Sequence, residues 1–471
     1  MKIKRNDFNY ACFVVVAILA LFVSICAITS GAIILSAVAS IFLFLYVERL
    51  FYYKVNIFVL FILTYFLYSL SGPIACHWGN GLSSVFPKPY LINEFMLYYI
   101  LGLLGIGTGA FFYFNFKPDC VTLSNTNWLC LNRKKIFLMV LFFSGCSSLF
   151  ELINLFRVGG VDALFRGKAF YQSAVSDLSF DLPSIETMTF SFVLFGLWFI
   201  SFKEKADEWG RVARRHLLLF LIMLPVLFDV LILGRRGTIL MWAAILLFAK
   251  YYFKNPKLSL RHTLLFLLFY CVLCSLFLLR SQVGYLRETH DFGKIVEYFS
   301  DIDRVVSSSN PATNEFGAPF GNFNTFLLAG KNDFLLGKSY WWGVLSLVPR
   351  SLLPARHQTI TYDFRDEFFA DWGGMGAIAG TGFSSLLDAY WNWGSIGVFV
   401  VFFIFGLALS WLELERRKNT SPYFVLFYLL LVPNVIEFHR QELGVSLFSV
   451  LLYVFVFYVA YSFNLRSSKR G

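Results

Sequence analysis

The chain has 471 residues and a net charge of +11, and 58% of its residues are hydrophobic, 20% aromatic and only 15% charged. Soluble domains carry about 25% charged residues, so this composition excludes an ordinary soluble protein and predicts a polytopic membrane protein. The sequence holds no GxxxxGK-Ser/Thr run, which argues against work driven by ATP.

Twelve apolar runs are long enough to cross a bilayer, and we expect all of them to be helical because lipid offers the backbone no other hydrogen-bond partner. They lie near residues 9–28, 32–48, 55–74, 95–116, 136–156, 187–202, 216–233, 238–253, 263–280, 394–412, 422–437 and 443–462. The predicted fold is therefore all-α, with about 12 transmembrane helices, and residues 1–471 form a single integral membrane domain. A large outward loop, residues 281–392, separates spans 9 and 10 and is long enough to cap an active site.

The distribution of Lys and Arg between the loops predicts the orientation. With the amino terminus in the cytoplasm, the inward segments hold 24 of the 40 Lys and Arg residues and the short outward segments hold seven. Both termini are therefore expected to be cytoplasmic, and the 281–392 loop periplasmic. The net charge of +11 mostly reflects this bias and does not imply binding of nucleic acid.

Two arginines lie between predicted membrane spans, in the tetrapeptide Gly234-Arg235-Arg236-Gly237. An arginine at the centre of a spanning helix costs roughly 2.5–3.5 kcal/mol, so such residues are usually functional or paired. A guanidinium group holds phosphate through two parallel hydrogen bonds. Asp229 lies on nearly the same helical face, which indicates an organised polar cavity. The pair is therefore interpreted as an anion site; snorkelling of both side chains to the headgroups is the alternative.

Further outward cations could join this pair around one anion. The candidates are Lys338, Arg350, Arg356 and Arg440. Together with Arg235 and Arg236, they would neutralise a diphosphate and stabilise it as a leaving group without a metal ion. The Asp301-Ile302-Asp303 run is interpreted as solvated charge, so neither a metal nor another cofactor is expected.

Asp388 is the best candidate for a general base, because it lies just before a predicted span among small and aromatic residues. An ordinary carboxylate at the start of a helix is the alternative. His439 is a second candidate base, and Tyr390 and Asn392 are candidates for contact with a sugar ring. An aromatic belt at the outer membrane interface would explain the surrounding tryptophans and tyrosines equally well.

Together these segments resemble the bacterial O-antigen polymerases, the family that joins oligosaccharide repeat units. The resemblance covers roughly residues 150–445 and includes Gly234–Gly237, Gly337-Lys-Ser-Tyr340, Pro349-Arg350, Pro354, Arg356, the run from Gly380 to Gly394, and Arg440. The chain departs from the family in carrying Asp388 where Glu is usual and Arg356 where Lys is common. The charge is kept at both positions.

The resemblance implies a metal-independent glycosyltransferase at the periplasmic face of the bacterial inner membrane. It would transfer a growing glycan from undecaprenyl diphosphate to the terminal sugar of a new lipid-linked repeat unit, and so extend O-antigen or a related surface polysaccharide. Asp388, Arg235 and Arg236 would be the catalytic residues, and Arg350, Arg356, Arg440 and Lys338 would bind the diphosphate. Besides membrane lipids and the two lipid-linked glycans, the implied partners are a chain-length regulator and a flippase.

Two other functions fit the same topology. An O-antigen ligase would use a similar donor but the lipid A core as its acceptor. A lipid-linked oligosaccharide flippase, or another transporter, would place polar groups along a path through both leaflets, usually between two repeated halves. In this chain the polar groups concentrate at the outer end and no repeat is evident, which favours the polymerase.

Overall fold

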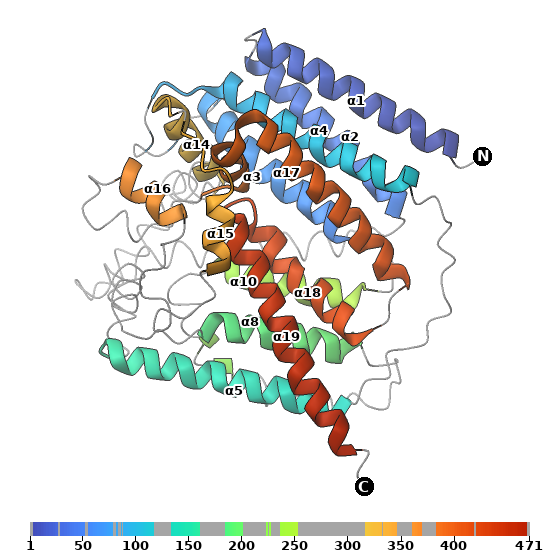
Figure 1. Cartoon of the computed structure of the whole chain (residues 1–471), viewed down its shortest axis with the longest axis vertical. Helices are drawn as coiled ribbons and strands as arrows, with labels where there is room; N and C mark the ends of the chain where they lie inside the picture. Colours follow the sequence, from blue (N-terminus) through green and yellow to red (C-terminus); the bar gives the residue numbers. More distant parts are fainter. Residues whose placement is uncertain are drawn as a thin grey trace, which may run out of the picture. The chain divides into compact units, whose positions relative to one another are not determined.

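The structure is a computed structural model, and helices are the regular secondary structure of the residues that it describes (Figure 1). These are residues 3–26, 29–51, 55–78, 88–116, 133–160, 184–200, 236–252, 316–331, 333–345, 360–369, 383–418 and 421–468, with the single positions 82, 86, 223, 224, 226 and 227. The prediction of an all-α protein is confirmed for these residues. Two predicted spans, 216–233 and 263–280, lie largely or wholly outside them.

Five helices of the described part are long and apolar enough to cross a membrane: α2 (Thr29–Phe51), α3 (Ile57–Trp78), α4 (Ile92–Phe116), α5 (Arg133–Val158) and α17 (Ser385–Lys418). Shorter apolar stretches lie in α1 (Ile3–Ile25), α8 (Ser184–Ile200), α10 (Arg236–Lys250), α18 (Pro422–Glu437) and α19 (Leu443–Ser468). These elements agree with a polytopic membrane protein. The number of twelve spans and the single membrane domain stay predictions.

The chain divides into two compact units by its internal contacts. The first unit comprises residues 1–127, 311–371 and 380–458, and the second comprises residues 128–310, 372–379 and 459–471. In the second unit, α8 packs against both α5 and α10. The Ser144 and Ser191 hydroxyls lie 2.6 Å apart, and the Trp242 indole donates to Thr189 Oγ1 at 3.0 Å.

In the first unit, the most extensive helix contact of the described residues joins α4 and α17. Glycines allow the two backbones to touch. A Cβ placed on Gly105 would lie 2.6 Å from the carbonyl oxygen of Phe399, and one on Gly109 would overlap the carbonyl oxygen of Phe403. Gly406 of α17 lies equally close to α4. Small residues at such spacing let membrane helices approach closely and gain packing contacts that lipid cannot replace.

Three short helices lie within the predicted loop 281–392: α14 (Ala318–Leu328), α15 (Lys338–Leu345) and α16 (Ile360–Phe368). Helix α14 packs where α3 ends and α4 begins. Asn324 Oδ1 accepts a hydrogen bond of 2.7 Å from the Leu91 amide, directly before α4. The Phe320 ring lies against Phe95, near the same end of α4. The described part of the loop is therefore folded onto one end of this unit.

Helix α17 is broken near its start. Trp393 has φ −144° and ψ 18°, and Gly394 has φ 65° and ψ −151°, so residues 385–392 form a short helix that precedes the long one. An L-residue rarely adopts the Gly394 conformation, and its Cβ would also lie 3.2 Å from the Phe334 ring. The predicted span 394–412 therefore begins at this break.

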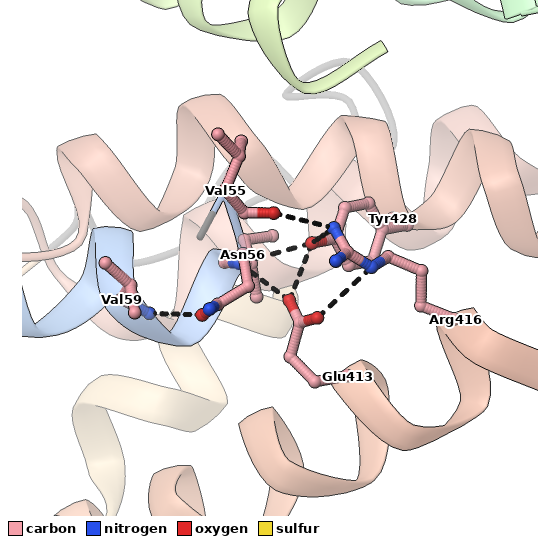
Figure 2. Close-up of polar contacts among 7 residues, drawn as sticks. Val55, Asn56, Val59, Glu413, Arg416 and Tyr428 are labelled. Atoms are coloured by element: carbon pink, nitrogen blue, oxygen red, sulfur yellow. Dashed lines mark hydrogen bonds and ion pairs between the residues drawn. The ribbon is translucent and has the colours of Figure 1, made fainter. Parts of the chain in front are cut away.

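A buried ionic cluster lies at the far end of α17 (Figure 2). Glu413 and Arg416 are 0% and 1% exposed, and the Arg416 Nε atom lies 3.2 Å from Glu413 Oε2. The Tyr428 hydroxyl of α18 donates to Glu413 Oε1 at 2.6 Å and accepts from Arg416 at 2.9 Å. This cluster joins α17 to α18.

The same cluster fixes the start of α3. The Ile57 amide, the first of that helix, donates to Glu413 Oε1 at 2.6 Å, and Arg416 donates to the Val55 carbonyl at 3.0 Å. Asn56 caps the helix by accepting from the Val59 amide at 2.7 Å (Figure 2). The first amides of a helix have no partner within it, so these side chains satisfy donors that would otherwise be buried unpaired.

The glycine contact predicts a difference between two glycine-to-alanine changes. Gly109→Ala should lower the melting temperature of the detergent-solubilised protein, because the added methyl group would push α4 away from α17; overpacking typically costs about 1–3 kcal/mol. Gly145→Ala in α5 is the matched control, since a Cβ there would meet nothing within 4 Å. A Gly109→Ala variant as stable as Gly145→Ala would contradict the backbone contact.

The ionic cluster predicts a rescue. Arg416→Met should lower the free energy of unfolding by about 3–5 kcal/mol, because it leaves a buried carboxylate without its partner. The double variant Glu413→Leu/Arg416→Met removes both charges and should recover part of that loss, because the Ile57 amide and the Tyr428 hydroxyl lose Glu413 as their acceptor. Folded yield and melting temperature in detergent would measure both effects. No recovery in the double variant would contradict the unpaired buried charge as the cause of the loss.

Candidate functional site

Asp388 lies in the short helix before the α17 break, and its side chain is buried, with the residue only 1% exposed. Three donors surround its carboxylate. The Ser339 hydroxyl donates to Oδ1 at 2.7 Å, the Asn392 amide group donates to the same oxygen at 2.9 Å, and the Leu443 backbone amide donates to Oδ2 at 3.2 Å. We call these residues, with Gly337, the Asp388 network.

Asn392 connects the members of this network. Its side-chain amide nitrogen also lies 2.7 Å from Ser339 Oγ, and its side-chain oxygen accepts from the Gly337 amide at 2.8 Å. Asn392 is fully buried. Its position four residues after Asp388 puts both side chains on one face of the short helix, which is what an i, i+4 spacing requires.

The break in α17 explains why residues 335–339 lie beside Asp388. Ending the short helix leaves its last carbonyl groups without intrahelical partners. The Leu335 amide donates to the Trp391 carbonyl at 3.0 Å, and the Leu336 amide donates to the Asn392 carbonyl at 3.1 Å. Leu336 and Gly337 then turn the chain through positive φ values of 50° and 87°. This turn starts α15 and brings Ser339 to the carboxylate.

The third element at the network is the start of α19. Leu443 is the first residue of that helix, and its amide points at Asp388 Oδ2. The amino terminus of a helix carries unpaired amides and a partial positive charge, so a carboxylate there is stabilised. The alternative interpretation of Asp388, a carboxylate at a helix start, also agrees with the structure, because Asp388 lies in the first turn of α17 and accepts from the first amide of α19.

His439 and Arg440 lie in the turn between α18 and α19. His439 is buried against α3: its Nε2 atom lies 3.2 Å from the Phe61 carbonyl oxygen, and its ring contacts Phe61 and Tyr65. Arg440 is partly exposed, and its Nε atom lies 3.6 Å from Glu437 Oε2. The chain continues from this turn into Leu443, so both residues lie within a few positions of the Asp388 network, but their described contacts are with other groups.

The remaining predicted residues divide into three groups. Lys338 is exposed and precedes Ser339, at the edge of the network. Tyr390 faces α4 and α14, where its ring contacts Tyr98 and Phe323. Arg236 begins α10 in the second unit. Arg235, Arg350 and Arg356 lie outside the described residues.

Three members of the network have no role in the sequence analysis: Gly337, Ser339 and Leu443. Gly337 and Ser339 lie in the segment Gly337-Lys-Ser-Tyr340, which carries the resemblance to the family only as a block. The Leu443 amide carries no sequence signal, because a backbone group is common to every residue. The spacing of Asp388 and Asn392 is the one signal that could have linked two of the members in advance.

The described features define a class of protein: a polytopic α-helical membrane protein with a buried, hydrogen-bonded carboxylate at one end of a long span. Residues 357–468 match the model of the family described as O-antigen polysaccharide polymerase Wzy. This segment contains Asp388, Asn392 and Leu443, and Ser339 lies before it. The predicted resemblance to the O-antigen polymerases is therefore confirmed, and the match supports a polymerase acting on O-antigen. No match was found among the curated proteins or the solved structures.

The network predicts different outcomes for two buried serines. Ser339→Ala removes a donor from a buried carboxylate and should lower the free energy of unfolding by about 1–3 kcal/mol. Ser385→Ala, in the same short helix as Asp388, is the control, because its buried hydroxyl has no hydrogen-bond partner among the described residues. Melting temperatures in detergent would compare the two. Equal stability would show that Ser339 contributes nothing to holding the carboxylate.

Proposed function

We propose that this protein polymerises undecaprenyl-diphosphate-linked oligosaccharide repeat units at the periplasmic face of the bacterial inner membrane. The single observation that carries the proposal is the match of residues 357–468 to the O-antigen polymerases. The buried carboxylate at Asp388 lies within this matched segment. The distribution of Lys and Arg between the loops supports a periplasmic position for the end of α17 that carries Asp388.

In the proposed reaction, the acceptor hydroxyl oxygen attacks the anomeric carbon of the donor sugar. A new glycosidic C–O bond forms, and the C–O bond to undecaprenyl diphosphate breaks, so the diphosphate leaves with the bonding electron pair. Asp388 takes the hydroxyl proton. Oδ2 is the oxygen suited to this role, because Oδ1 already accepts two bonds shorter than 3 Å and Oδ2 accepts one of 3.2 Å.

Cationic groups would stabilise the leaving diphosphate in this mechanism. Lys338 is exposed beside the network and can reach a phosphate group there. Arg236 belongs to the proposed set as the sequence analysis predicts it. Arg235, Arg350, Arg356 and Arg440 complete the proposed set. Such charges act most strongly where water is excluded, and they need no metal ion.

Within this proposal, the remaining site residues have supporting roles. Asn392 orients the carboxylate through its hydrogen bond to Oδ1. Tyr390 and His439 line the aromatic packing around α3, α4 and α14, so we assign them to shaping the site rather than to proton transfer. A chain-length regulator and a flippase would act before or alongside this protein.

The function predicts a specific glycan phenotype for Asp388. Asp388→Asn keeps the size of the side chain but removes its basicity, so we expect a folded, inserted protein with polymerisation reduced at least 100-fold, in line with the usual contribution of a general base. Asp388→Glu, the residue usual in the family, should retain measurable activity. Gel electrophoresis of the lipopolysaccharide from a complemented deletion strain would show both results.

The same gel distinguishes the polymerase function from the ligase function. Loss of a polymerase leaves one repeat unit on the lipid A core, whereas loss of a ligase leaves none. Protein amount in the membrane fraction is the control for folding. Long chains from Asp388→Asn at normal protein levels would refute the role of the base, and bare core in the deletion strain would refute the polymerase.

A further inference from the structure

One face of α17 is exposed and apolar along its length. Its large side chains are Trp393, Ile396, Val400, Ile404 and Trp411, which are 39%, 75%, 44%, 55% and 40% exposed. Ile396, Val400, Ile404 and Trp411 follow one another at intervals of four or seven residues and lie on a single helical face, and Trp393 lies at the break that precedes this helix. The opposite face, which includes Val398 and Phe402, is fully buried.

Two tryptophans lie at the ends of this surface. Trp393 lies at the break, and the helix from residue 395 to Trp411 rises over 16 positions, which corresponds to about 24 Å. The hydrocarbon core of a membrane is about 30 Å thick, and tryptophan is enriched at both of its boundaries. The exposed face of α17 therefore fits a lipid bilayer, with Trp393 at the boundary on the side of the Asp388 network.

The apolar surface continues from Trp393 onto a segment of the predicted periplasmic loop. Phe334, Leu336 and Trp341 are 46%, 73% and 60% exposed. This segment contacts the break in α17. The Tyr340 and Trp393 ring centroids lie 5.2 Å apart, and a Cβ on Gly337 would lie 3.3 Å from the Trp393 ring. The segment 334–341 therefore extends the lipid-facing surface of α17 beyond the helix itself.

We propose that Phe334, Leu336, Trp341 and Trp393 form a membrane-interface anchor, which inserts the 334–341 segment into the boundary between headgroups and acyl chains. The occupant of this surface is the bilayer rather than a protein partner, because the surface is continuous with a helix face whose length and terminal tryptophans match the membrane. Lys338 is exposed in the same segment, where its ammonium group can reach the lipid phosphates.

This anchor determines the depth of the Asp388 network. Ser339 lies between Leu336 and Trp341 in the sequence and donates to Asp388 directly, so the carboxylate lies within one or two side-chain lengths of the interface. Resting on the proposed function, this depth is where the diphosphate of a lipid-linked glycan would lie. Part of the 281–392 loop would then belong to the membrane boundary and not to the periplasm.

Photo-crosslinking tests the anchor. The photoreactive residue p-benzoylphenylalanine would replace Leu336 or Trp341 in the full chain, with Lys331 and Asp366 as control positions that are exposed at polar sites of the same unit. Membranes from a strain without lipid-linked repeat units would be irradiated, and the labelled peptides analysed by mass spectrometry. We expect phospholipid adducts at 336 and 341 to exceed those at 331 and 366 at least fivefold.

Each other result contradicts the anchor. Adducts to another protein, or to a second copy of this chain, at positions 336 and 341 would assign the surface to a protein partner. Equal phospholipid adducts at all four positions would show no preferential insertion. A variant that does not reach the membrane is replaced by one with the same photoreactive residue at Phe334 or Trp393. Because no glycan is polymerised in this assay, its result is independent of the proposed enzymatic function.

Discussion

The carboxylates carried by α17 are the constraint on which the described architecture of the first unit depends. Asp388 accepts from the first amide of α19, and Glu413 accepts from the first amide of α3. A membrane offers no water to such amides, so each helix start must find a partner within the protein. One helix thus fixes where two others begin, and the glycine contact with α4 holds that helix in place.

Hydropathy predicted the long apolar helices of the described part because a bilayer imposes a minimum length on every span, but it did not predict the short helices α14, α15 and α16. It could not predict lateral neighbours. Ser339 and Asp388 are 49 residues apart, and Ile57 and Glu413 are 356 apart, yet each pair is hydrogen-bonded. Arg416 shows that a charge count does not reveal the environment of a side chain. It is one of the inward Lys and Arg residues counted for the orientation, but it is 1% exposed and paired with Glu413. The helix break at Gly394 could not be predicted from the sequence either, because glycine is common in membrane helices that are not broken.

The candidate site combines one part that the structure describes and one that remains a proposal. The described part is a carboxylate held by a serine, an asparagine and a helix amino terminus, inside the segment that matches the O-antigen polymerases. The cationic part was predicted from residue type and predicted sidedness. Arg440 stays a predicted member of this cationic set; its Nε atom lies 3.6 Å from Glu437 Oε2.

The link between Asp388 and α19 has a consequence for biosynthesis. Helix α19 follows α17 in the chain, so Asp388 and the short helix that carries it are made before the Leu443 amide exists. Likewise, Glu413 and Arg416 are translated before Tyr428. Nascent chains that stop before α18 would expose buried charges without their partners, and membrane quality-control proteases could distinguish them from finished molecules. Synthesis of α18 and of the start of α19 would then act as the checkpoint for stable insertion of α17.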